Sequence, residues 1–172
     1  MKWPFGREEK RKKVPPVDYA SVLTDEEQQE CQGMWRSLTR TNGGSYAVKD
    51  GLADSLKRSV IALCMMGRAE RFLIEAGCGS LRVPLTAGQD HRPECAERAC
   101  QAAAKACSIF PLSIYFYDFA CVLRQAGKQD EAKRMFAEFL SRVETEALDP
   151  IMRTFLKQRD VEGAVQHARE MT

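Results

Sequence analysis

The chain has 172 residues and a mass of 19.4 kDa, which is typical of one domain or a short array of repeats. Hydrophobic residues make up 44% and charged residues 29%, values that argue against a disordered, collagen-like or fibrous protein. The longest uninterrupted hydrophobic run, Val60 to Met66, is far shorter than the ~20 residues that a membrane-spanning helix needs. The composition therefore predicts a soluble, mainly helical domain.

Positive charge is concentrated at the N-terminus. Six basic and two acidic residues lie within the first 13 positions, which leaves the other 159 residues with a net charge of −2. Residues 1–22 show no hydrophobic periodicity and are predicted to form a disordered basic tail. Its basic cluster could be a nuclear import signal, a contact to an anionic membrane or solubilising charge only: Lys10, Arg11, Lys12 and Lys13.

The chain contains seven cysteines, an odd number, and no secretory signal precedes them. We expect reduced thiols that pack as small hydrophobic side chains in a cytoplasmic protein. A zinc site would have to combine Cys78, His91, Cys95 and Cys100, which lack the two closely spaced ligand pairs typical of structural zinc. We therefore predict neither a metal nor a cofactor.

Residues 23–76 are predicted to form the N-terminal helices. The first begins at a capping box, in which Thr24 and Glu27 can each bind a free backbone amide of the other. The second runs from about Asp50 to Ala76, and Gly67 could divide it into two helices. Two hydrophobic faces follow from the helical spacing of this segment: one carries Leu52, Leu56, Val60, Leu63 and Cys64, and the other carries Phe72, Leu73 and Ala76.

Residues 77–92 form a predicted loop, rich in glycine and proline, that could be either a lid or a simple connection. Pro93 then suits the first turn of a helix. The inward face of that helix carries only small side chains, so it must lie very close to its neighbour: Ala96, Ala99, Cys100, Ala103, Ala106 and Cys107.

Four further hydrophobic stripes at helical spacing follow, and their short connections predict antiparallel hairpins. The stripes lie within the ranges 116–123, 132–143, 148–156 and 161–171. The last one is predicted to contact the preceding helix through Val161, Ala164, Val165, Ala168 and Met171. Its other face is polar, which is typical of a helix that caps an array: Glu162, Gln166, Arg169 and Glu170.

Residues 113–146 resemble a tetratricopeptide repeat, a 34-residue helix pair with a glycine at the turn and small residues where the helices touch. Gly127 occupies the turn and Ala132 the close-contact position, and the first helix carries Phe116, Phe119, Ala120 and Leu123. Ala99 and Ala164 lie about one repeat length before and after Ala132. The resemblance implies an all-α fold over residues 23–172, in which antiparallel helical hairpins stack as a short solenoid.

No residue spacing indicates a catalytic site. His91 and His167 are 76 positions apart, and neither has a nearby Ser, Cys or Asp at the spacing of a nucleophile motif. No glycine-rich phosphate loop is present. We therefore expect no enzymatic activity, and we expect His167 to be exposed.

Tetratricopeptide arrays bind peptides or partner helices in a groove lined by the first helices, and the resemblance places four residues on that face: Ile114, Tyr117, Cys121 and Arg124. It implies a non-enzymatic interaction module or adaptor for an apolar peptide or an amphipathic helix. Alternatively, Tyr115 and Tyr117 only cover neighbouring helices. Two other functions stay open: a pentatricopeptide-like RNA-binding protein, which the charge of −2 disfavours, and a membrane-associated accessory protein that uses the basic tail.

Overall fold

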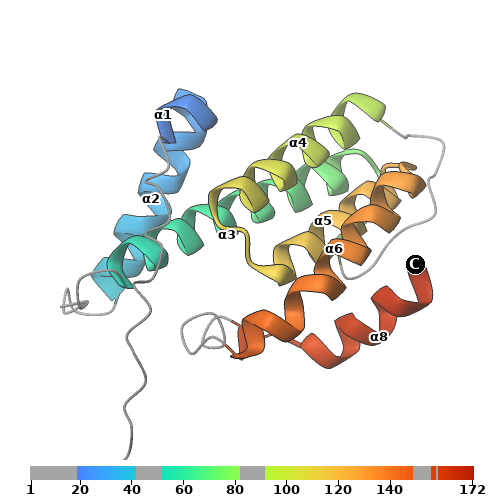
Figure 1. The fold of residues 1–172 in the computed structure, drawn as a ribbon. Helices are drawn as coiled ribbons and strands as arrows, with labels where there is room; N and C mark the ends of the chain where they lie inside the picture. The colour runs from blue at the N-terminus through green and yellow to red at the C-terminus, as the bar shows by residue number, and fades with distance from the viewer. Residues whose placement is uncertain (1–18, 42–51, 82–91, 149–155, 158) are drawn as a thin grey trace, which may run out of the picture.

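A computed structural model describes residues 19–41, 52–81, 92–148, 156–157 and 159–172. These residues form helices joined by turns and contain no β-strand, which confirms the all-α fold class. The helices are α1 (Tyr19–Val22), α2 (Asp25–Thr41), α3 (Leu52–Glu75), α4 (Pro93–Ile109), α5 (Ser113–Gln125), α6 (Gln129–Leu148) and α8 (Val161–Met171). They follow one another as antiparallel neighbours from α3 to α6 (Figure 1).

Three predicted boundaries differ from the structure. Residues 19–22, within the predicted tail, form α1, which is too short to leave a periodic signal. Gly67 does not divide α3, because burial along this 24-residue helix outweighs the ~1 kcal/mol that a helical glycine costs. Leu148 ends α6 instead of opening a new helix, and most of the predicted helix 148–156 lies outside the described residues, as does the cluster Lys10–Lys13.

The start of α2 confirms the predicted capping box. The backbone N–H of Thr24 donates to Oε2 of Glu27 at 2.8 Å, and the backbone N–H of Glu27 donates to Oγ1 of Thr24 at 3.3 Å. These bonds satisfy amides that have no partner inside the helix.

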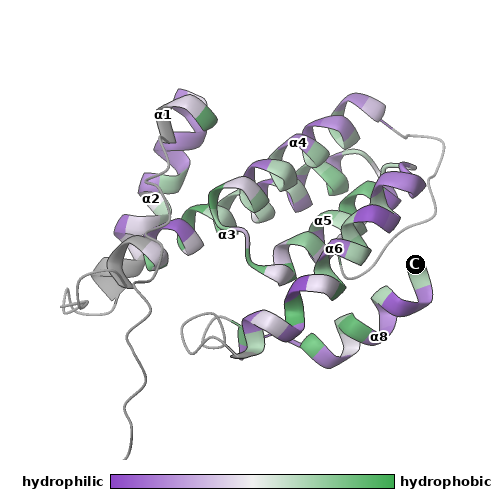
Figure 2. Ribbon diagram, in the orientation of Figure 1, coloured by the Kyte–Doolittle hydropathy of each residue, from purple (hydrophilic) through white to green (hydrophobic). Residues whose placement is uncertain are grey.

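Ion pairs attach α2 to α3 and α4. The buried guanidinium of Arg68 lies 2.7 Å from Glu30 and 3.0 Å from Glu26, and Lys105 lies 2.6 Å from Glu27. Burial opposes the ionisation of Glu27, but hydrogen bonds from Lys105 and Thr24 outweigh it, so the pKa of Glu27 is lowered. Helix α2 is mostly hydrophilic (Figure 2), and besides its apolar contacts through Cys31 and Met34 these ion pairs join it to α3 and α4.

The core lies where α4 meets α3 and α5. All six small residues on the predicted inward face of α4 are buried, and Ala99, Ala103 and Ala106 are fully so. Side chains of this size let the axes of two helices approach closely. They share one hydrophobic core with buried residues of α3 that include Ala62, Met65, Ala69 and Leu73.

Helices α5 and α6 form the predicted hairpin. Gly127 adopts a φ of 80° at the turn, a left-handed conformation that disfavours other residues. Ala132 is buried at the close contact, and Phe136 and Phe139 of α6 are completely buried against α5. The carboxylate of Glu146, near the end of α6, accepts the Ser113 N–H at 2.8 Å and so caps the first turn of α5.

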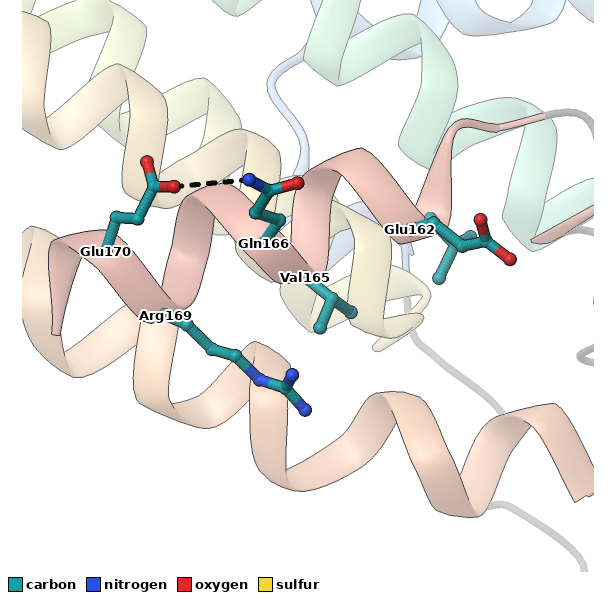
Figure 3. A pocket seen from close by; sticks show the side chains of 6 residues that line it. Glu162, Val165, Gln166, Arg169 and Glu170 are labelled. Atoms are coloured by element: carbon teal, nitrogen blue, oxygen red, sulfur yellow. Dashed lines mark hydrogen bonds between the residues drawn. The ribbon is translucent and has the colours of Figure 1, made fainter.

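Helix α8 packs on α6 and α5 mainly through the buried Ala164 and Ala168. The predicted stripe is only partly buried at its edges, because Val161 and Val165 lie about 60° and 100° around the helix from Ala164. Val165 therefore lines a shallow surface depression on α8 beside Arg169 (Figure 3). The predicted polar face is exposed as expected.

Two neighbouring substitutions test this docking. Ala168→Asp places an unpaired charge in a fully buried position and should lower the free energy of unfolding by at least about 2 kcal/mol. Arg169→Ala changes an exposed side chain and should cost no more than about 0.5 kcal/mol. Chemical denaturation measures both values. Equal effects would show that α8 is not docked through Ala168.

Candidate functional site

One groove contains all four residues that were predicted to bind a peptide. They lie on one face of α5, the floor of the groove: Ile114, Tyr117, Cys121 and Arg124. Ile114 and Cys121 are buried, whereas Tyr117 and Arg124 are half-buried. The groove has a volume of about 900 Å³.

The two walls come from α3 and α8, which lie on opposite sides of α5 (Figure 1). The α3 wall consists of Leu63, Met66, Gly67 and Glu70, and the α8 wall of Gly163, Ala164 and His167. Met34 of α2 and Leu81 contribute further apolar side chains.

Leu63 lies on a predicted hydrophobic face of α3 with Val60 and Cys64, but it is 45% exposed whereas those two residues are buried. Helix α3 is hydrophobic on more than one face, so periodicity alone could not show which face remains uncovered. The exposed leucine makes the α3 wall of the groove apolar.

Tyr115 and Tyr117 have different roles. Tyr115 is buried in the core, and its hydroxyl donates to the Ser59 carbonyl at 3.4 Å. Tyr117 packs against Phe136 and Phe139 of α6, with ring centroids 5.7 Å and 5.4 Å away, and also lines the groove. The two proposed roles of Tyr117, covering a helix and lining a groove, are thus compatible.

A hydrogen-bonded cluster joins the groove floor to α8. His167 Nδ1 lies 2.8 Å from the Tyr117 hydroxyl, and His167 Nε2 lies 3.2 Å from Nη1 of Arg124. A guanidinium only donates, so Nε2 must be the acceptor and Nδ1 must carry the proton of a neutral ring. The Tyr117 hydroxyl then accepts the hydrogen bond that Nδ1–H of His167 donates.

His167 is therefore half-buried and hydrogen-bonded, which corrects the prediction that it is exposed. Burial, together with the positive charge of Arg124, lowers the pKa of His167 below its usual 6.5. The ring is neutral at pH 7, as its bond to Arg124 requires.

Cys121 is not an activated nucleophile. Burial raises the pKa of its thiol to about 11, so the thiolate is scarce near neutral pH. Burial also raises the pKa of Tyr117. The cluster consequently acts as a neutral hydrogen-bonded link between two helices.

Charged side chains surround the apolar part of the groove. Arg159 pairs with Asp118 at 3.4 Å, and Arg124 also donates to Sδ of Met171 at 3.4 Å. Glu70 accepts the backbone N–H of Leu81 at 3.3 Å, and Asp160 accepts that of Gly163 at 3.0 Å. Within the described ranges, neither Glu70 nor Asp160 forms an ion pair.

All seven cysteines are free and buried, which agrees with the prediction that they pack as small hydrophobic side chains. No group of three or more potential metal ligands comes together in the part of the chain that the structure describes. His91, a member of the hypothetical zinc set, lies outside that part.

The chain shows no significant match to a protein-family model, to a curated protein or to a solved structure. Among residues 19–41, 52–81 and the other described ranges, no helix is both long and apolar enough to cross a lipid bilayer.

The His167 cluster makes stability depend on pH. The pKa of His167 is lower in the folded than in the unfolded chain, so the unfolded chain takes up the proton first as the pH falls. The free energy of unfolding should therefore decrease as the pH drops below about 6.5, and His167→Gln should reduce this decrease. Denaturant titrations above and below pH 6.5 measure this change in the free energy of unfolding, with His91→Gln as the control. An unchanged slope in His167→Gln would contradict the neutral, hydrogen-bonded ring.

Proposed function

We propose that this protein is a non-enzymatic interaction module, and that its groove over α5 binds a peptide or helix of a partner protein. The observation that carries the proposal is the exposure of Leu63 on the groove wall, above the apolar floor of Ile114 and Cys121. A concave surface that combines exposed apolar side chains with a few polar groups is typical of a binding site.

The order of the helices supports a solenoid arrangement related to tetratricopeptide repeats. α3 and α4 form one hairpin and α5 and α6 the next, and the groove is lined by the first helix of each pair. In tetratricopeptide arrays, the first helices line the binding groove. The wall formed by α8 departs from that pattern, because α8 corresponds to a second helix of the repeat.

The charges of the groove favour a protein over RNA as the partner. Its lining contains three carboxylates, from Glu70, Asp118 and Asp160, and two guanidinium groups, from Arg124 and Arg159. A nucleic-acid backbone is bound through an excess of positive charge, which this lining lacks.

Leu63 and Ile74 provide a matched test. Both are exposed hydrophobic residues of α3, but only Leu63 lines the groove. We expect wild-type protein and Ile74→Asp to recover the same partners in quantitative affinity purification from cells that produce the protein. Leu63→Asp should lose those partners while keeping its helical circular dichroism, because a charge in the groove opposes apolar contact.

Identical partner sets for the three proteins would contradict the proposal, and so would a wild-type protein without a specific partner. If Leu63→Asp loses its helical circular dichroism, the purification is repeated with Leu63→Ser, which removes apolar surface without adding a charge.

A further inference from the structure

The groove-facing side of α3 has three features that no contact within the described chain explains. Leu63, Gly67 and Glu70 follow one another at intervals of four and three residues and so share one helical face. Leu63 is 45% exposed, a Cβ atom at Gly67 would meet no atom within 4 Å, and the carboxylate of Glu70 accepts only a backbone N–H.

Gly67 is the least expected of these residues. Glycine is unfavourable inside a helix, and Gly67 is not among the glycines of positive φ, so its backbone conformation does not require glycine. No neighbouring side chain fills the space that a larger residue would occupy. A glycine at this place allows a close approach by a group from outside the chain.

The opposite wall and the floor suit the same kind of ligand. Gly163 and Ala164 of α8 are small, and Ile114 and Cys121 form an apolar floor between the walls. A volume of about 900 Å³ corresponds to about two turns of an α-helix with a diameter of 10 Å. The groove therefore has room for a short helical segment.

The charges indicate which helix fits. Asp118 is neutralised by Arg159, but Glu70 on one wall and Asp160 beside the other have no cationic partner among the described residues. A second copy of this chain that docked its own α3 face here would bring the two Glu70 carboxylates together. A ligand with basic side chains on both edges would pair with both carboxylates instead.

We propose that the groove accepts an amphipathic α-helix of a partner protein, with a small residue against Gly67 and lysine or arginine opposite Glu70 and Asp160. This inference rests on the proposed function and specifies the chemistry of the partner. The apolar face of the ligand helix would cover Leu63 and Ile114, and its basic edges would remain at the rim of the groove.

A phage-displayed library of random 16-residue peptides, selected against the full chain, provides the probe. We expect the enriched peptides to carry hydrophobic residues at helical spacing, flanked by lysine or arginine. Fluorescence anisotropy then measures how tightly these peptides bind to variants of the groove.

Gly67→Leu should weaken binding roughly tenfold or more, because its side chain fills the position of closest approach. Gly33→Leu on α2 is the matched control, since Gly33 is also helical and open but does not line the groove, and it should leave affinity unchanged. Glu70→Lys should weaken binding roughly fivefold or more, and replacing only the basic peptide residue opposite position 70 by glutamate should restore it.

The results separate this inference from the proposed function. Two results would overturn the inference and leave the proposed function intact. In the first, the enriched peptides fail to bind Leu63→Asp but are acidic. In the second, they bind Gly67→Leu as tightly as the wild-type protein. Peptides that bind Leu63→Asp and wild type equally, or no enriched peptide at all, would overturn both.

Discussion

The close contact between α3 and α4 determines the rest of the structure. α4 presents alanines and cysteines to its neighbours, and this allows α3 to lie close along one side of it. α5 packs against both helices and closes the core. Because α4 and α5 cover one side of α3, the face of α3 that carries Leu63, Gly67 and Glu70 lies beside the groove. The exposed leucine is thus a consequence of where the small residues of α4 lie.

The groove also depends on α8, which is held less firmly than the central helices. Its contact surface combines the buried Ala164 and Ala168 with the partly buried Val161, Val165 and Met171, and the Tyr117–His167–Arg124 cluster adds directional bonds to α5. The apolar contact holds α8 on the core, and the hydrogen bonds fix its orientation relative to α5. A neutral His167 ring is required for the bond that its Nε2 accepts from Arg124, so this link between α8 and α5 depends on the protonation of His167.

Features set by local spacing could be predicted from the sequence. These include the capping box at Thr24, the buried face of α4, the turn at Gly127 and the grouping of Ile114, Tyr117, Cys121 and Arg124. Features that depend on which faces of two helices pack together could not be predicted from the sequence. The exposure of Leu63, the burial of His167 and the open space at Gly67 follow from contacts between distant segments. The N-terminal boundary was missed because α1 is a single turn without periodicity.

Methyl NOE spectroscopy on protein labelled with ¹³C at alanine and leucine methyl groups tests the central packing most directly. We predict cross-peaks between the buried methyl groups of Ala62 and Ala69 in α3 and those of Ala99, Ala103 and Ala106 in α4. The Leu63 methyl groups should show no cross-peak to these α4 alanines, because they line the groove. Cross-peaks from Leu63 to α4, with none from Ala62 and Ala69, would mean that α3 presents a different face to the groove and would contradict the account.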